Sequence, residues 1–442
     1  MRNIRRAMRG ITVRHCDVKR LSLVVTSGVL AVTSVAFVGS TGSAAAASKA
    51  PVQIDMFVPL TGPSGSIGLT ADVPGFLAAQ QAINSEGGIL GRQLDLIQTD
   101  LGADPADSVA AARQMLARYP NLSGVVGLTS DTAIVSAQIF NSDKMVTMTQ
   151  SGTTQLDHVH YKYVFRDYPS DGSLSVAMTA AALSQGYKRA AFLFGENAGS
   201  QENIAPIIKL YTSHGGTVVV NEPLPLDQTN YDTEIASALS SNPQVILYET
   251  DSQTAATLFS ELTTLEAGKT VPVIGTSFLA NLAWLTPVAN AVGGFATLGQ
   301  MVHFLSTPTN PPNSAYPGFF TALKKVEKHP SLYANSYVAD NYDSVIIEAL
   351  AMDLANSTNP RVYVKDIVKV TNNHQGRRVT TYSQGLAAIK QHVPFFYATT
   401  MGSMYFNQYH SVIGAWDIAA TNGAGKIVTT TVLSDAILAK YS

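Results

Sequence analysis

The sequence has few charged residues, almost no cysteine and none of the local motifs of common enzymes. Charged residues make up 14% of the 442 residues, well below the ~25% that is usual for globular proteins. The 29 basic and 31 acidic residues nearly balance, so the strongly basic surface of a nucleic-acid-binding protein is not expected. The hydrophobic fraction of 46% is normal, which excludes a chain that is disordered throughout.

Catalytic motifs are missing as well. There is no His-Glu-x-x-His and no Gly-x-Ser-x-Gly, so neither a zinc hydrolase nor a serine hydrolase has local support. His158 and His160 are two residues apart, which puts their rings on opposite faces of an extended strand and does not favour a shared metal. Gly423–Lys426 lacks the first glycine and the Ser/Thr of a phosphate loop and is interpreted as a turn. We therefore expect no catalytic residue, no metal and no cofactor.

The small net charge of −2 hides an uneven distribution. Residues 1–50 contain eight basic residues and one acidic residue, a net charge of +7, so the chain from Pro51 onward carries −9. A basic stretch to Arg20, an apolar run over 21–38 and the small residues 43–48 are typical of a secretory signal peptide, with cleavage expected near 47–50. The alternative is an uncleaved membrane anchor, because the apolar run approaches the ~20 residues that span a bilayer.

The single cysteine, Cys16, lies in the basic part of this leader, ahead of the apolar run. It is therefore not placed to be the lipid-modified cysteine of a lipoprotein signal. After cleavage the chain would contain no cysteine, so disulfides and thiolate metal sites are excluded from the exported part. We expect a protein exported to the periplasm or to the outer face of the cytoplasmic membrane or cell wall.

From Val52 onward, short apolar runs alternate with amphipathic stretches. Strands are expected in the first part, with helices between them, at 52–58, 94–97, 124–128 and 145–148. The alternation then restarts, with strands expected at 189–194, 217–220, 245–248 and 271–275. This pattern predicts an α/β fold with two parallel sheets flanked by helices. A Pro/Asn-rich loop at 306–317, helices over 319–327 and 341–355, and a β-rich tail complete the chain.

Uncharged polar residues follow three of the strands in the first part. The segments are 60–66, 129–132 and 149–154, and all are rich in serine, threonine or glycine. Hydroxyl and backbone N–H groups near helix starts suit a carboxylate or another small anion. The same residue types also cap helices, so each segment taken alone has a purely structural interpretation. Three such segments in one half favour a binding site.

These segments are part of an ordered series of motifs that resembles the type-1 periplasmic binding proteins, specifically the solute receptors of ABC transporters for branched-chain amino acids. Residues 59–68 resemble the first loop of that family, and 82–92 are similar to its helix-end motif with an Ile-Asn pair before Gly-Gly-Ile-x-Gly. Asp100 and Asp104-Pro105 match the acidic strand end that follows, and Tyr342-Asp343 resembles the opening of a late helix.

The resemblance implies two lobes with a solute trapped between them. By analogy, the chain would cross between the lobes near Tyr168, Gly299 and Met401. Lobe 1 would comprise 51–168 plus 300–400, and lobe 2 would comprise 169–299 plus 401–442. The family's Phe-Asp-x-x-Gly turn is replaced here by residues 406–410, so the third crossing is the least well matched.

The resemblance also implies ligand-binding residues on lobe 1. The serine that holds a ligand carboxylate corresponds to Ser130, with Thr129 and Asp131 as alternatives because of a one-residue gap. A pair that gives backbone and hydroxyl contacts corresponds to Ser151 and Thr153. These residues imply a solute that carries a carboxylate. An aromatic residue of the family's first loop corresponds to Ile67.

On lobe 2 the family pattern changes at the residues that bind the ligand ammonium. The acidic residue that pairs with ammonium corresponds to Ser277, and an aromatic partner falls near Asp251. Tyr248, Glu249 and Asp251 are candidates to replace them. Burying an ammonium without a carboxylate is costly, so a standard α-amino acid requires Glu249 or Asp251 to reach the ligand.

The function that follows from the resemblance is a binding protein without enzymatic activity. It would trap a small carboxylate-bearing or amino-acid-like solute by hinge closure and deliver it to the membrane permease of an ABC importer. We expect a monomer that has no nucleic-acid partner. The alternatives are a sensor of the same fold for an amide, urea-like or aromatic solute, and a secreted hydrolase.

Overall fold

The structure is a computed structural model that describes residues 50–62, 65–102, 104–128, 130–265, 271–308, 310–412 and 414–442. The predicted signal peptide and Cys16 lie outside the described residues. Within the described part of the chain, no helix is both long enough and apolar enough to cross a membrane.

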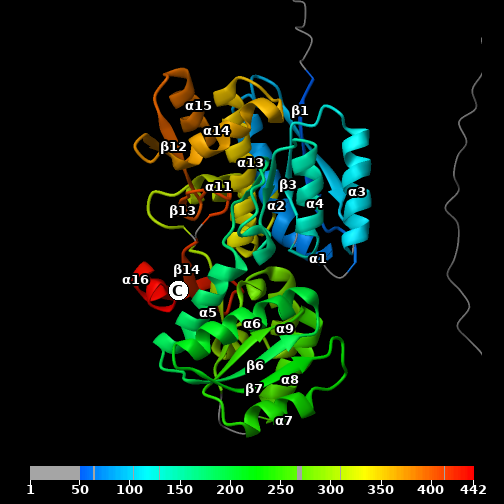
Figure 1. The fold of residues 1–442 in the computed structure, drawn as a ribbon, viewed down its shortest axis with the longest axis vertical. Coiled ribbons are helices and arrows are strands. Elements are labelled where there is room, and N and C mark those ends of the chain that lie inside the picture. Colours follow the sequence, from blue (N-terminus) through cyan, green and yellow to red (C-terminus); the bar gives the residue numbers. More distant parts are fainter. Residues whose placement is uncertain are drawn as a thin grey trace, which may run out of the picture. The chain divides into compact units, whose positions relative to one another are not determined.

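The first part of the chain forms a five-stranded parallel sheet in the order β2-β1-β3-β4-β5. Its strands are β1 (Val52–Val58), β2 (Leu94–Asp100), β3 (Gly124–Gly127), β4 (Thr147–Thr149) and β5 (Val164–Arg166). Helices α3 (Pro105–Arg118) and α4 (Ser130–Ser142) cover one face, and α2 (Val73–Ser85) lies on the other (Figure 1). Burial on both faces explains why β3 contains no polar side chain and why β1 is mostly apolar.

The second part forms a seven-stranded sheet in the order β15-β14-β10-β9-β8-β6-β7. Five strands are parallel, and β14 and β15 add an antiparallel edge. The strands are β6 (Arg189–Gly195), β7 (Thr217–Leu224), β8 (Val245–Glu249), β9 (Val273–Gly275), β10 (Val302–Ser306), β14 (Trp416–Thr421) and β15 (Ile427–Leu433). The helices of this part are α5 (Asp171–Ser184), α6 (Ala198–Ser213), α7 (Asp232–Ser240), α8 (Ser252–Leu265), α9 (Leu282–Ala291), α10 (Phe295–Met301) and α16 (Asp435–Tyr441).

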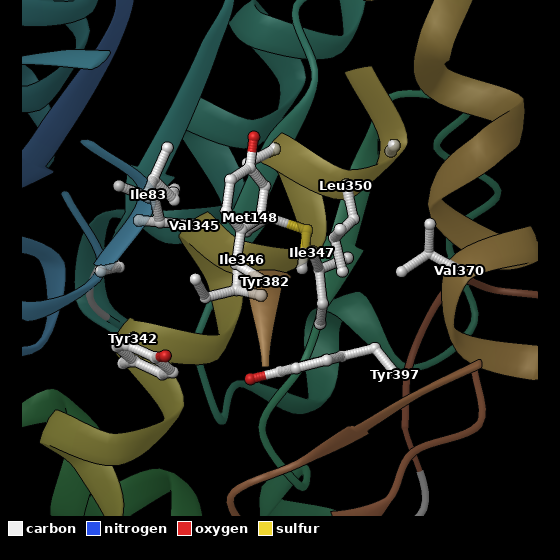
Figure 2. Close-up of a cluster of buried hydrophobic side chains, with 14 of the residues drawn as sticks. Ile83, Met148, Tyr342, Val345, Ile346, Ile347, Leu350, Val370, Tyr382 and Tyr397 are labelled. Carbon is white, nitrogen blue, oxygen red and sulfur yellow. The ribbon is translucent and has the colours of Figure 1, made fainter. Parts of the chain in front are cut away.

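Residues between β10 and β14 return to the core of the five-stranded sheet. The central element is α13 (Ser336–Ala355), which packs against α2 and is buried over most of its length. Figure 2 shows Tyr342, Ile346 and Leu350 of α13 packed among side chains from α2, β4, α14 and β12. The remaining elements are α11 (Tyr316–Val326), α12 (Pro330–Tyr333), α14 (Pro360–Asn372), β11 (Arg377–Val379), α15 (Tyr382–Lys390), β12 (Phe395–Thr399) and β13 (Gly402–Ser403).

The predicted α/β fold with parallel sheets is confirmed. Every strand predicted before residue 280 is present, with ends that differ by a few residues. Residues 158–160 form a turn and coil, so the strand geometry considered for the two histidines does not apply. The rings of His158 and His160 both lie against the ring of Tyr409, at centroid distances of 5.3 and 4.6 Å.

The chain passes between the two sheets three times. The passages are the segments between β5 and α5, between β10 and α11, and between β13 and β14. Tyr168 lies in the first passage. Gly299 lies inside α10, ahead of a strand that still belongs to the seven-stranded sheet. Met401 precedes Phe406, which packs in the core beside the five-stranded sheet.

Candidate functional site

The loop after β4 is the part of the predicted site that the structure defines best. Ser151 and Thr153 are both buried, with 1% of their surface exposed. The Oγ1 atom of Thr153 accepts a hydrogen bond from the backbone N–H of Gln155 at 3.3 Å, at the start of a short 3-10 helix (Thr154–Leu156). Thr153 therefore does cap a helix, as the structural interpretation expected. Its hydroxyl proton is still available for a second partner.

That second partner comes from the seven-stranded part of the molecule. The hydroxyl groups of Thr153 and Thr154 both donate to Oε1 of Glu202 on α6, each at 3.0 Å. A single carboxylate oxygen thus accepts two hydrogen bonds from the β4 loop. These bonds connect the two sheet-bearing parts of the chain at the predicted ligand-binding threonine.

Two further carboxylates lie beside Glu202. Glu249, at the end of β8, is 5% exposed, and its Oε2 atom accepts from Thr276 Oγ1 at 2.6 Å and Asn203 Nδ2 at 3.0 Å. Asp171 is the first residue of α5, and its backbone N–H donates to the carbonyl oxygen of Gly152 at 2.8 Å. A Cβ atom added at Gly152 would lie 2.3 Å from Oδ1 of Asp171. The β4 loop therefore runs directly against the Asp171 carboxylate.

The pKa of Asp171 is shifted by its burial and by the carboxylates near it. Burial, followed by repulsion from Glu249 and Glu202, raises the pKa of Asp171 to about 8. The Arg166 guanidinium opposes this shift in the pKa, and Asp157 adds to it. We name the group of Asp171, Glu202 and Glu249 the carboxylate cluster. At neutral pH it holds a proton that a bound cation would displace.

Arg166 binds the β4 loop at two points. It is 3% exposed, its Nη1 donates to the carbonyl oxygen of Thr153 at 3.0 Å, and its Nη2 pairs with the carboxylate of Asp157. The guanidinium thereby holds both ends of the segment that carries Thr153. This restraint fixes the direction of the threonine hydroxyls.

A second set of polar contacts approaches the carboxylate cluster from α13. The hydroxyl of Tyr337 donates to Oγ of Ser277 at 3.3 Å, and its ring stacks on Tyr168 at 4.9 Å. Burial raises the pKa of Tyr337, and Asp171 contributes to this shift, which places the two residues in electrostatic contact. Gln150 donates to the carbonyl oxygen of Tyr337 at 2.9 Å and so links α13 to the β4 loop.

Of the residues predicted to bind the ligand, Ser151 and Thr153 contact each other in the β4 loop, and Glu249 and Ser277 lie at the ends of the neighbouring strands β8 and β9. Tyr248 lies instead in the hydrophobic core, against the rings of Phe259 and Trp284. Asp251 accepts from the backbone N–H groups of Gln253 and Thr254 at the start of α8.

The other predicted residues lie on α1 (Gly65–Ile67) and α4. Ile67 is half-buried at the end of α1, a short helix that contacts α9. Ser130 and Asp131 begin α4, and Thr129 is outside the described residues. The backbone thus puts the start of α4 immediately after β3, next in the sheet to β4.

Sequence reasoning missed Asp171, Glu202, Asn203, Arg166 and Tyr337. Asp171 follows the N-cap Ser170, where an acidic residue is explained by the helix dipole alone. Glu202 lies within a helix, where nothing in the local sequence indicates a partner from another part of the chain. The one signal in the sequence was Ser277, which stands where the family has an acidic residue that pairs with ammonium. This difference indicated that another acidic residue takes that role.

The donor set of this region is suited to binding polar groups rather than metals. Among the residues that the structure describes, no group of three or more His, Cys, Asp or Glu side chains is arranged to hold a metal ion. The region offers hydroxyl donors from Thr153 and Thr154, carboxylate acceptors, and an amide from Asn203. This set can hold a small molecule that carries N–H donors.

Comparison with known proteins identifies the family of this chain. Residues 51–375 match the family described as periplasmic binding protein. A Leu/Ile/Val-binding protein homolog from Brucella melitensis is 23% identical over 352 residues, which cover 79% of this chain and 90% of the relative.

Solved structures of solute-binding proteins show the same fold. A leucine-binding protein from Thermotoga maritima has a TM-score of 0.69 at 17% identity and covers 87% of this chain and 99% of its own. A solute-binding protein from R. palustris in complex with benzoate has a TM-score of 0.69 at 14% identity, with coverage of 87% and 96%. A branched-chain amino acid binding protein from Streptococcus pneumoniae in complex with isoleucine has a TM-score of 0.68 at 15% identity, with coverage of 86% and 99%.

These likenesses confirm the two-lobed fold predicted from the sequence motifs. The family match covers well over half of the 442 residues and includes the β4 loop, Asp171, Glu202 and Glu249. The chain belongs to the periplasmic binding protein family.

Proposed function

We propose that this protein is the extracytoplasmic receptor of an ABC importer and that it binds its solute where the β4 loop meets the carboxylate cluster. The observation that carries the proposal is the pair of hydrogen bonds from Thr153 and Thr154 to Glu202, because they join the two sheet-bearing parts at Thr153, a predicted ligand-binding residue. Binding would proceed without chemical conversion of the solute.

The two sheets would be the two lobes of a hinge-closing receptor. We propose that lobe 1 comprises 51–166 and 316–412 and that lobe 2 comprises 171–306 and 416–442. The second passage, between 306 and 316, and the third, between 412 and 416, differ from the expected crossings at Gly299 and Met401. The new limits follow from the pairing of β10 with β9 and from the packing of Phe406 and Val412 beside the five-stranded sheet.

The solute would be small and amino-acid-like. Its polar groups would contact Ser151 and Thr153 on lobe 1, together with Ser130 at the start of α4. A positively charged group would pair with Asp171 and Glu249, which replace the ammonium-binding acid that the family has at Ser277. Related proteins bind leucine, isoleucine or benzoate, which shows that the fold accepts both amino acids and other small solutes.

The partner of the loaded receptor would be a membrane permease that recognises the closed lobes. A monomer is sufficient for this role, because both halves of the proposed site come from one chain. Export through a signal peptide within residues 1–50 would deliver the receptor to the outer side of the cytoplasmic membrane.

Substitution of the lobe 1 hydroxyls tests the proposal. We expect Ser130→Ala and Thr153→Ala each to weaken solute binding about tenfold, since a hydrogen bond to a charged group is worth ~1.5–3 kcal/mol. The measurement is calorimetric titration of the tightest solute found by thermal-shift screening of amino acids, amines, amides and carboxylic acids. Thr321→Ala, an exposed threonine on α11, is the matched control. Unchanged affinity in both site variants would contradict the location of the site.

A further inference from the structure

The hydroxyl donors of the β4 loop already have a carboxylate partner. Thr153 belongs to the pair of residues implied to contact the solute through backbone and hydroxyl groups, and Oε1 of Glu202 accepts from both Thr153 and Thr154 at 3.0 Å. A solute carboxylate at the same hydroxyls would have to displace Glu202. The displaced Glu202 would remain close by, because α6 is anchored to the same sheet as Glu249.

One buried acceptor beside the carboxylate cluster lacks a hydrogen-bond donor. It belongs to Asn203, which follows Glu202 on α6. Asn203 is 5% exposed, and its Nδ2 donates to Glu249, whereas its Oδ1 has no hydrogen-bond partner among the described residues. A buried amide oxygen without a donor costs free energy. In Asn203 this oxygen belongs to the same side-chain amide as Nδ2, which donates to Glu249. A ligand with N–H groups would satisfy it, whereas a carboxylate would not.

The charge balance favours the same class of ligand. Three carboxylates lie close enough for Glu202 and Glu249 to act on Asp171, and the basic group that opposes them, Arg166, already pairs through two of its nitrogens with Asp157 and Thr153. A solute carboxylate would bring a further negative charge into a site of low dielectric. An ammonium group supplies three N–H donors and one compensating charge.

We propose that the solute is a small cation without a free carboxylate, namely a primary amine or the amide of an amino acid. The inference rests on the proposed receptor function and narrows its ligand class. Glu202 determines this specificity, because its carboxylate occupies the hydroxyls that a zwitterionic amino acid would need. An amino acid would bind only after Glu202 has left Thr153 and Thr154.

The test compares solutes that share one side chain. Calorimetric titrations at pH 8 would use 3-methylbutylamine, leucinamide, leucine and 4-methylpentanoate, followed by the corresponding phenylalanine series. We expect the amine or the amide to bind at least about tenfold more tightly than the amino acid, which corresponds to ~1.4 kcal/mol. The free acid should give no binding heat.

A glutamine substitution then tests the role of Glu202. Glu202→Gln keeps a carbonyl oxygen for the two threonines and removes one negative charge. We expect it to weaken amine binding and strengthen amino-acid binding, so that the preference falls by about tenfold. Glu196→Gln, an exposed glutamate ahead of the same helix, is the matched control and should leave the preference unchanged.

The possible results separate the two proposals. Tightest binding of leucine, phenylalanine or a free acid to the unmodified protein would overturn the amine preference and leave the receptor function standing. An unchanged preference in Glu202→Gln would also overturn it. Failure of every solute in both series to bind the protein and its variant would contradict the receptor function itself.

Discussion

At the scale of single residues, the Thr153 hydroxyl shows how one group serves structure and binding together. Its oxygen accepts from Gln155 N–H and its proton goes to Glu202. The structural interpretation and the binding interpretation of such a threonine are therefore compatible. The family resemblance implied Thr153 from the sequence, whereas Glu202 required the three-dimensional fold.

Asp171 makes a prediction about pH. The pKa of Asp171 is raised to about 8, so at pH 6 its carboxyl is largely protonated and must lose its proton to pair with a cation. We therefore expect the affinity for an amine to rise with pH between 6 and 8, by at most about tenfold per pH unit, and to level off above that range. Calorimetry at pH 6, 7, 8 and 9 measures this dependence.

The charged groups that face Asp171 define the controls for that experiment. The charged groups are Glu249 on β8, Glu202 on α6, Arg166 on β5 and Asp157 in the β4 loop, and the neutral phenol of Tyr337 on α13 is a further titratable group. Asp171→Asn should bind the amine more weakly and without the rise between pH 6 and 8. Asp232→Asn, at an exposed position on α7, should behave as the unmodified protein does. An affinity that falls as the pH rises would contradict the role of Asp171.

At the scale of elements, the sequence predicted the long and regular parts best. The strand β1 matches its predicted bounds, because five of its seven residues are apolar and it is buried on both faces, although Gln53 and Asp55 interrupt the apolar run. In contrast, β5 has three residues and no detectable periodicity, yet it carries Arg166. The α13 helix begins earlier than predicted, at Ser336, because Asn335 caps it by accepting from the N–H of Val338. That earlier first turn contains Tyr337.

The β4 loop depends on an ion pair between the buried Arg166 and the partly buried Asp157, which makes a prediction about stability. Arg166→Ala would leave Asp157 without its cation and free the carbonyl oxygen of Thr153. We expect the free energy of unfolding to fall by about 3 kcal/mol, the usual cost of removing one partner of a buried pair. Urea denaturation measures this loss, and solute binding should weaken in parallel because Thr153 is no longer held.

An ion pair whose basic partner is exposed provides the comparison. Lys369 is exposed and pairs with the buried Asp366 at 2.7 Å on α14. Lys369→Ala should lower the free energy of unfolding by less than Arg166→Ala does, because water screens the exposed ammonium group of Lys369. Equal losses in the two variants would show that Arg166 does not act as a buried anchor.

At the scale of the whole molecule, stability should depend on buried acids near the five-stranded sheet. Asp55, Asp167, Asp343 and Glu348 are fully buried. Burial is the main cause that raises the pKa of Asp55 and Asp343 to about 7 and that of Asp167 to about 8, and it raises the pKa of Glu348 as well. These carboxyls hold protons in the folded protein that they release in the unfolded chain at neutral pH.

The sign of the effect follows from this difference. Between the unfolded pKa of about 4 and the folded value near 7 to 8, the folded state binds more protons, so each group lowers stability by up to ~1.4 kcal/mol per pH unit as the pH rises. We expect a higher thermal midpoint at pH 5 than at pH 8. Glu348→Gln should reduce the difference, and the exposed Glu86→Gln should not. A midpoint that increases from pH 5 to pH 8 would contradict this account.

The interleaving of the two lobes could be predicted only through family resemblance. Nothing in the local sequence of β10 shows that it pairs with β9 and β14 rather than with the first sheet. Likewise, the return of Phe406 and Val412 to the core beside α13 depends on packing between residues far apart in the chain. The alternation of strands and helices predicted the layers, and long-range contacts fixed which segment belongs to which sheet.

The central claim is that one small solute binds where Thr153 meets the carboxylate cluster. Native mass spectrometry tests it most directly, with the protein incubated in an equimolar mixture of amines, amides, amino acids and carboxylic acids. We predict a one-to-one adduct with a cationic solute that is lost in Asp171→Asn and Thr153→Ala and kept in Thr321→Ala. No adduct from any class, or an adduct that persists in both site variants, would contradict the claim.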